Sequence, residues 1–308
     1  MKKSFENIKV VGLGQACLDC LGRISDFPLE DQKVELDDIQ MQCGGPASTA
    51  LVALSRFGIR TSFFGSISDD LFGLEIIRGL KRERVDFHFL KVTPGYSSQF
   101  AFIAVTKKNG NRTIFWHRGT VPHLKMNDVN LQPFSKARIL HLDGLMIEAS
   151  QEAARQAKSM GLRVVLDAGT MREGSTELVA LVDVLIASEK FVEPLVGVEA
   201  SSEKALKALM QLGPEEVIIT MGSRGSIGWN GEKMILQKAF PVRAVDTTGA
   251  GDVYHGAYIY GMLQGWSMER GMRFASAVSA MKCKKGGARE GIPLLDEVAP
   301  FMKQYPSF

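Results

Sequence analysis

The sequence predicts an α/β protein built on a mainly parallel sheet. Short runs of apolar, β-branched residues recur along the chain, and segments with helical spacing of apolar residues separate them. Neither a linker nor a repeat nor a low-complexity tract interrupts the 308 residues, so we expect one unit spanning 1–308. The expected strands occupy 9–14, 63–67, 138–142, 162–167, 182–186 and 216–220.

The segment after the first strand argues against a familiar nucleotide-binding motif. Gly12-x-Gly14 could begin a dinucleotide-binding fingerprint, in which a helix follows the glycines directly. Residues 18–31 instead contain several turn-forming residues and lack helical periodicity. These features argue against an NAD-dependent oxidoreductase.

Helices and hairpins complete the expected order of elements. Pro46 suits the first turn of a helix over 46–57, and Gly58 suits its C-terminal cap. The other expected elements are helices near 71–84 and 268–281, a hairpin of 97–106 and 112–117 about Asn109-Gly110, and a hairpin about Asn230-Gly231.

Composition and charge exclude several function classes. Lys and Arg number 37 against 34 Asp and Glu, and the resulting charge of +3 is too small to indicate a nucleic-acid or anionic-membrane surface. No apolar run approaches the roughly 18 residues that cross a bilayer. Glu6 and Lys9 interrupt the apolar region that a secretion signal would need. We therefore expect a cytoplasmic protein that binds a small molecule, with no nucleic acid or membrane as partner.

Four cysteines are too few for a disulfide-stapled fold, which also favours a reducing compartment. Cys17 and Cys20 form a CxxC motif, which could be a redox pair or, with Cys43, half of a zinc site. The alternative is two small side chains after a strand. Since no second CxxC or CxxH completes a zinc site, the sequence favours that alternative.

The strongest chemical signal is DTTGAGDVYHG, over 246–256. Gly249 and Gly251 flank Ala250 at the start of an apolar helix, so their backbone N–H groups can form an anion hole at the positive end of the helix dipole. Asp252 lies inside this segment. It would repel a stored anion but could accept a proton from a hydroxyl that attacks a phosphoryl group. The plainer alternative is a glycine-rich turn with an aspartate at the helix start.

Two glycine-rich segments together resemble a known family. DTTGAGDVYHG is similar to the C-terminal signature of the ribokinase-like (PfkB) sugar kinases, and Gly44-Gly45 with the following helix resembles their N-terminal signature. The resemblance implies a three-layer α/β/α ribokinase-like fold with a small β-sheet lid, formed by segments about 20–42 and 97–118. It also implies ATP-dependent phosphorylation of a hydroxyl of a sugar or sugar acid, with Mg²⁺, and a homodimer paired through the lid.

The resemblance assigns roles to individual residues. Asp252 would be the general base, and the amides of 249–251 would form the anion hole. Asp19 and the backbone around Gly44 and Gly45 would bind acceptor hydroxyls.

Two further groups of residues are implied by the same resemblance. Asp246 and Thr248, with backbone near Gly287, match the region where many members hold a monovalent cation such as K⁺, for which ordinary turn chemistry is the alternative. The residues expected to bind the nucleotide are Ser188, Thr220, Gly222, Ser223 and Gly225.

Two departures from the family pattern affect the expected site. Thr49 replaces the usual Asn, whose longer side chain often reaches the sugar, so we expect Thr49 to bind the acceptor through its single hydroxyl and by different contacts. The usual N-x-x-E motif falls on Ser188 to Phe191, so both key residues are lost. Magnesium would then be organised differently, for example through Glu193, which could equally be a solvated helix residue.

The acceptor is indicated only by its expected charge. Several segments most resemble the branch containing sulfofructose kinase, but Trp116 and Leu145 fall where that enzyme binds the sulfonate, and only Lys33 matches. The segment NRTIFWHRGT resembles the lid of 2-keto-3-deoxygluconate kinases, where Arg118 would clamp a carboxylate. Lys33, Arg112 and Arg118 are therefore candidate ligands for an anionic acceptor, with solvated lid charges as the alternative.

Two other functions stay open. A non-catalytic or regulatory protein of the same fold is favoured by the loss of N-x-x-E and opposed by Asp252 within an intact GAGD. A nucleoside kinase is the second alternative.

Overall fold

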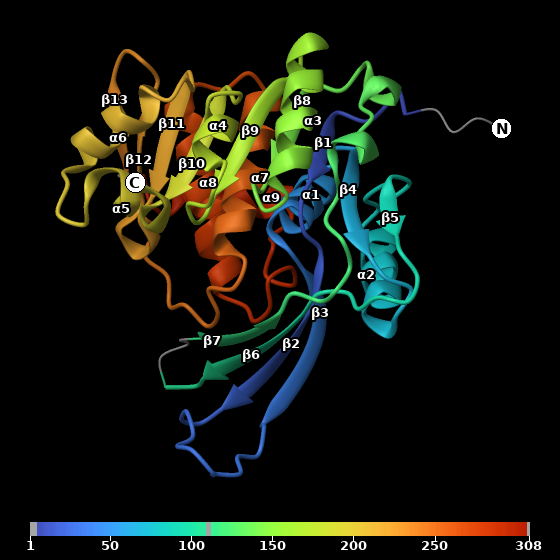
Figure 1. The fold of residues 1–308 in the computed structure, drawn as a ribbon. Helices are drawn as coiled ribbons and strands as arrows, with labels where there is room; N and C mark the ends of the chain where they lie inside the picture. Colours follow the sequence, from blue (N-terminus) through green and yellow to red (C-terminus); the bar gives the residue numbers. More distant parts are fainter. Residues whose placement is uncertain (1–4, 109–111, 307–308) are drawn as a thin grey trace.

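The computed structural model describes residues 5–108 and 112–306 and arranges them in three layers (Figure 1). A twisted sheet forms the middle layer, helices cover both of its faces, and a smaller sheet projects from one edge. The α/β class predicted from the sequence is confirmed.

The bounds of the main-sheet strands and of the helices follow. The strands are β1 (Val10–Leu13), β4 (Thr61–Ile67), β5 (Leu90–Val92), β8 (Ile139–Leu142), β9 (Arg163–Ala168), β10 (Val184–Ser188), β11 (Glu216–Thr220), β12 (Ser226–Trp229) and β13 (Met234–Gln237). The helices are α1 (Pro46–Arg56), α2 (Leu71–Arg82), α3 (Ile147–Ser159), α4 (Ser175–Val179), α5 (Glu189–Val196), α6 (Ser202–Met210), α7 (Ala250–Leu263), α8 (Met268–Cys283) and α9 (Leu295–Lys303), with 3₁₀ turns η1 (Met126–Asp128), η2 (Gln132–Phe134) and η3 (Gly222–Arg224).

The strand order of the main sheet is β13-β12-β11-β10-β9-β8-β1-β4-β5. Every neighbouring pair from β11 to β5 is parallel, whereas β12 and β13 pair antiparallel at one edge. The parallel arrangement brings the carboxyl ends of these strands to one edge of the sheet, where α/β proteins bind their ligands.

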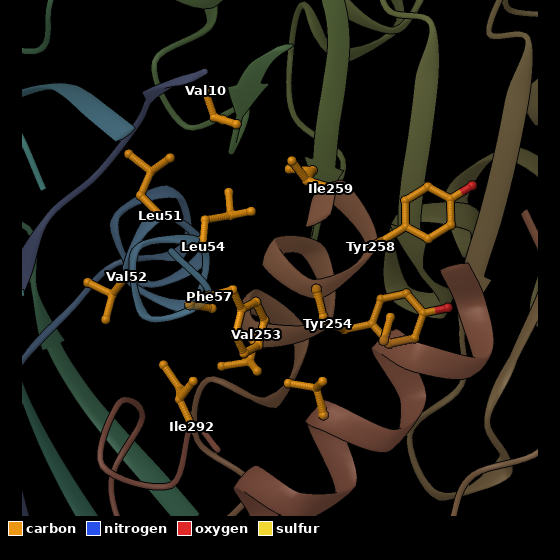
Figure 2. Packing of buried hydrophobic residues seen from close by; sticks show 14 of the residues in the cluster. Val10, Leu51, Val52, Leu54, Phe57, Val253, Tyr254, Tyr258, Ile259 and Ile292 are labelled. Carbon is orange, nitrogen blue, oxygen red and sulfur yellow. The ribbon is translucent and has the colours of Figure 1, made fainter. Parts of the chain in front are cut away.

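Side-chain alternation along the strands produces a core on each face of the sheet. Val10 belongs to the cluster that contains α1, α7 and α8, and its neighbour Val11 belongs to the cluster on the opposite face. Figure 2 shows Leu51 of α1 and Val253 of α7 within the first cluster. A Cβ at Gly256 would lie 2.5 Å from the carbonyl oxygen of Ala50, so this glycine allows α1 and α7 to pack closely.

The smaller sheet, which we call the lid, consists of β2 (Cys17–Ile24), β3 (Asp38–Gly44), β6 (Phe100–Thr106) and β7 (Arg112–His117). Its order is β3-β2-β6-β7, and β2 pairs parallel with β6 while the two edge strands pair antiparallel. A small β lid was expected from the sequence, and its first strand begins three residues before the expected segment, at Cys17.

The structure also bears on the expectations for the cysteines and for the two hairpin turns. Cys17 and Cys20 lie within β2 rather than after a strand, and the four cysteines are free thiols. The hairpin about Asn230-Gly231 is present as β12 and β13, whereas the turn expected at Asn109-Gly110 lies outside the described residues. Within 5–108 and 112–306, no helix combines the length and apolar character that a membrane span requires.

Candidate active site

The expected anion hole lies at the start of α7. Gly249 caps the helix with φ of 72°, and a Cβ there would lie 2.8 Å from Cβ of Ala288. A Cβ at Gly251 would meet no atom within 4 Å, so the space beside the first turn is open. The N–H groups of 249–251 therefore lie at the positive end of a helix dipole, beside a space that an anion can enter.

Asp252 follows in the first turn of α7, among several charged groups. Burial and the nearby Asp167, with a smaller effect of Asp19, raise the pKa of Asp252 to about 6, while His255 and Lys282 act in the opposite direction. A carboxylate with this pKa is ionised at neutral pH and still binds a proton readily. These properties suit a general base.

His255 is held inside the protein, not presented to a ligand. It is 4% exposed, with Nδ1 2.7 Å from the carbonyl oxygen of Gly251 and Nε2 3.3 Å from that of Ile186. Nε2 also lies 3.5 Å from Oδ1 of Asp167, at the end of β9. From the sequence, His255, one turn into the same helix, was expected to cover the helix surface rather than to contact substrate, and its burial and hydrogen bonds agree with a packing role. Asp167 was not singled out, because an aspartate at the end of a strand carries no distinctive pattern.

The expected acceptor residues Asp19, Gly44 and Gly45 lie together. Asp19 is buried in β2, and Sγ of Cys17 donates a hydrogen bond of 2.9 Å to its Oδ1. A Cβ at Gly44 would lie 2.1 Å from Oδ2 of Asp19, so only glycine leaves room for this carboxylate. Gly45 has φ of 99°, and a Cβ there would lie 2.2 Å from the carbonyl oxygen of Gln15.

Arg289 was missed by the sequence reading and lies behind these acceptor residues. It is 5% exposed, and its Nη2 donates to Oγ of Ser48 at 2.7 Å and to the carbonyl oxygen of Gly44 at 3.2 Å. Its Nε lies 3.4 Å from Oγ1 of Thr49. Thr49 is fully buried, and its hydroxyl accepts a hydrogen bond from Arg289. A contact between Thr49 and the acceptor stays a prediction. No local motif identifies an arginine that acts 240 residues away from its partner.

The expected nucleotide residues gather at the carboxyl ends of two neighbouring strands. Ser188 ends β10 and pairs in register with Thr220, which ends β11. Oγ of Ser188 donates to the carbonyl oxygen of Gly169 at 2.7 Å, and Oγ1 of Thr220 donates to that of Ala187 at 3.3 Å. The residues that follow Thr220 form η3 and the turn after it: Gly222, Ser223 and Gly225.

Asp246 and Thr248 form a buried turn just before the anion hole. Oδ1 of Asp246 accepts the N–H of Thr248 at 2.8 Å, and Oδ2 accepts that of Gly287 at 2.7 Å. Burial alone would raise the pKa of Asp246, but Lys282 and these N–H donors lower it. Nζ of Lys282, in α8, donates to the carbonyl oxygen of Asp246 at 2.8 Å.

The three expected lid cations occupy different environments. Arg112, at the start of β7, donates to Oγ1 of Thr247 and so connects the lid to the turn before the anion hole. The guanidinium of Arg118 lies over the Trp116 ring, 5.1 Å from its centroid. Lys33 is exposed in the connection between β2 and β3.

A cavity of about 210 Å³ lies at the ends of β8 and β9. Asp143 and Arg172 contribute to its wall, together with Asp167. Burial raises the pKa of Asp143 to about 7, while its hydrogen bonds from the N–H groups of Gln15 and Leu145 act in the opposite direction. The cavity therefore combines two carboxyl groups with one guanidinium group, close to the edge of the sheet where the carboxyl ends of the parallel strands lie.

Metal binding was expected to involve Glu193, which is exposed on α5. Among the residues that the structure describes, no group of three or more His, Cys, Asp or Glu side chains is placed to hold a metal ion. The water-mediated magnesium contact of Glu193 stays a prediction.

Comparison with known proteins gives relatives along almost the whole chain. The chain is 29% identical over 301 residues to a ribokinase of Haemophilus influenzae, covering 94% of this chain and 97% of the relative. It is 25% identical over 325 residues to a 5-dehydro-2-deoxygluconokinase of Clostridium perfringens, covering 98% and 94%.

Solved structures show the same fold. A putative ribokinase from Agrobacterium tumefaciens superposes with a TM-score of 0.90 at 25% identity, covering 98% of this chain and 99% of the other. Arabidopsis thaliana ribokinase complexed with ribose and ATP gives 0.82 at 25% identity, covering 96% and 99%. These matches confirm the three-layer ribokinase-like fold with its lid. The model of the pfkB family carbohydrate kinases matches residues 7–295, and the chain therefore belongs to this family of carbohydrate kinases.

Proposed function

We propose that this protein transfers the γ-phosphoryl group of ATP to a hydroxyl of a sugar or sugar acid, with Asp252 as general base. The observation that carries the proposal is a carboxylate with a pKa of about 6 in the first turn of α7, beside the open space at Gly251. In the transfer, Asp252 takes the hydroxyl proton and the acceptor oxygen bonds to the γ-phosphorus. The bond from that phosphorus to the β,γ-bridging oxygen breaks, and ADP leaves.

The chain's other residues bind and orient the two substrates. The 249–251 amides would stabilise charge on the transferred phosphoryl group. Asp19 and the Gly44-Gly45 backbone would bind acceptor hydroxyls, and residues at the ends of β10 and β11 would bind ATP. Mg²⁺ bound to ATP would neutralise the β- and γ-phosphate oxygens. The ATP-bound Arabidopsis relative supports ATP as the donor.

An anionic acceptor is supported by positive charge between the lid and the cavity beside Asp143. Burial and the nearby guanidinium groups of Arg118 and Arg172 lower the pKa of His123, so both arginines lie near one imidazole. Arg172 also lines the cavity. Arg118 would bind a carboxylate of the acceptor. Arg112 donates to Thr247, which favours a role in docking the lid over a role in acceptor binding.

A homodimer through the lid is part of the proposal. The six residues of β7 are all exposed, and Ile114, Phe115 and Trp116 are each about half exposed. On the opposite edge strand, Ile39 and Met41 are also more than half exposed. An apolar sheet with exposed edges suits pairing with a second copy.

The test is ADP release with ATP and Mg²⁺ across ketoses, aldoses, sugar acids, sulfofructose and nucleosides, with Asp252→Asn as the blank. A substrate whose turnover disappears in the variant supports the proposed kinase activity. The charge of that substrate decides whether Lys33 and Arg118 bind an anionic acceptor. A nucleoside as best substrate would replace the sugar assignment. ATP binding without turnover of any acceptor would favour the regulatory alternative.

A further inference from the structure

Lys282 has an environment that is unusual for a lysine. Its side chain is fully buried in α8, and Nζ donates a 2.8 Å hydrogen bond to the carbonyl oxygen of Asp246. Lysines are almost never fully buried unless their charge is compensated, because removing an ammonium from water is costly. The position of Lys282 therefore calls for a specific function.

The turn that Lys282 contacts leads directly into the anion hole. Both carboxylate oxygens of Asp246 accept backbone N–H groups, from Thr248 and Gly287, and its carbonyl oxygen accepts from Lys282. Burial lowers the pKa of Lys282, and the carboxylate of Asp246 acts in the opposite direction by supplying compensating negative charge. Gly249 and α7 follow within a few residues, so the ammonium fixes the approach to the anion hole.

A second cation contacts the same turn from the lid. Arg112 of β7 donates to Oγ1 of Thr247, the residue after Asp246. A free monovalent cation at this turn would therefore meet the buried ammonium of Lys282 and the exposed guanidinium of Arg112. It would also have to compete with Lys282 for the Asp246 carbonyl oxygen. Within the part of the chain that the structure describes, the buried Oγ1 of Thr248 has no hydrogen-bond partner and could face a cation, but the positive charges at this turn do not suit the monovalent cation that the family resemblance implied here.

We propose that Lys282 provides, as a fixed ammonium group, the positive charge that a monovalent cation would provide at the Asp246 turn, so that this kinase works without K⁺. An ammonium group carries the same charge as K⁺ and binds carbonyl oxygen as a compact point charge. The part of this inference that concerns turnover rests on the proposed function, whereas the part that concerns ion binding does not.

The first experiment compares the wild-type protein in K⁺, Na⁺ and tetramethylammonium salts at constant ionic strength. The expected result is the same turnover, within a factor of about two, and the same melting temperature in all three salts. At least tenfold faster turnover in K⁺, or a melting temperature raised by K⁺ alone, would overturn the proposal. The comparison of melting temperatures tests ion binding even if the acceptor is unknown or Asp252 is not the base.

The second experiment removes the charge with Lys282→Met and uses Lys285→Met, an exposed lysine of the same segment, as the matched control. We expect Lys282→Met to lose at least tenfold in turnover in tetramethylammonium and to recover part of this loss, with a higher melting temperature, in K⁺. The control should match the wild type in every salt. A folded Lys282→Met protein as active as wild type without K⁺ contradicts the proposal, and if this variant does not fold, the wild-type comparison decides.

Discussion

Nε2 of His255 lies 3.5 Å from Oδ1 of Asp167, and the buried imidazole and the partly buried carboxylate form a pair next to Asp252. Nδ1 of the same ring faces the carbonyl oxygen of Gly251, which can only accept, so this nitrogen carries a proton. The negative end of the pair raises the pKa of Asp252, and the imidazole lowers it.

The pair leads to a prediction about pH dependence. Asp252 must be ionised to accept a proton, so kcat/KM should fall as the pH decreases through about 6. Asp167→Asn removes a negative charge and therefore lowers the pKa of Asp252, moving the acidic limb by roughly one pH unit to lower pH. His255→Gln removes the opposing group and should move the limb to higher pH.

The measurement is kcat/KM from pH 4.5 to 8.5 for the wild type and both variants. Asp296→Asn, an exposed carboxylate on α9, is the matched control and should leave the limb unchanged. Limbs that move in the same direction in both variants would show that the pair does not act through its charges. The titratable groups that surround Asp252 and the pair are Cys17, Asp19, His141, Asp143 and Lys282.

Replacing the proposed base itself gives a second prediction. Asp252→Asn keeps the shape of the side chain but cannot accept the hydroxyl proton at neutral pH. We expect kcat to fall by about 10²- to 10⁴-fold, the usual contribution of a general base, while ATP still raises the melting temperature. Near-normal turnover would remove Asp252 from the mechanism, and loss of the ATP effect would indicate a structural defect instead.

A third prediction concerns the glycine beside Asp19. Because a Cβ at Gly44 would lie 2.1 Å from Oδ2 of Asp19, Gly44→Ala should displace this carboxylate and raise KM for the acceptor about tenfold. KM for ATP should change little, because the expected ATP residues lie at β10 and β11. Equal effects of Gly44→Ala on both KM values would argue against a specific acceptor role.

The sequence predicted the parts of the fold that repeat a local pattern, and it missed others for identifiable reasons. The parallel strands other than the three-residue β5 were predicted because each is a compact apolar run, and α1 was predicted because its apolar residues repeat at helical spacing. The short α5 and the final α9 were not resolved individually, and each contains a proline, at 194 and 300, that weakens a helical pattern.

In the candidate site, too, residues that belong to a local sequence pattern were predicted and residues that act through long-range contacts were not. Asp252 and the 249–251 amides could be proposed from the sequence because one contiguous segment carries them. Arg289 and Lys282 were missed because each acts on a partner tens to hundreds of residues earlier, Thr49 and Asp246. Such long-range contacts depend on the packing of α8 and the turn after it against the rest of the protein, which no local pattern encodes.

The last prediction tests Arg289, which holds the backbone of Gly44 and the hydroxyl groups of Ser48 and Thr49 in place. Arg289→Ala removes the donor to the buried hydroxyl oxygens of Ser48 and Thr49, whereas the Gly44 carbonyl oxygen still accepts from Ser48. Each group left unsatisfied costs about 1–3 kcal/mol, so the melting temperature should fall. KM for the acceptor should rise at least tenfold, while kcat at saturation should change less. The reason is that Arg289 positions Gly44 and the start of α1 without touching the reacting atoms. Arg60→Ala, at an exposed arginine, is the matched control.

Arg289→Lys separates positioning by the guanidinium from simple retention of charge. Lysine keeps the positive charge but cannot present the planar set of donors that reaches Ser48, Thr49 and Gly44 together. If geometry is what matters, Arg289→Lys should therefore retain most of the elevated acceptor KM measured for Arg289→Ala. A lysine variant with wild-type KM would show that charge alone suffices, and an alanine variant with unchanged KM but lower stability would reduce Arg289 to a structural residue.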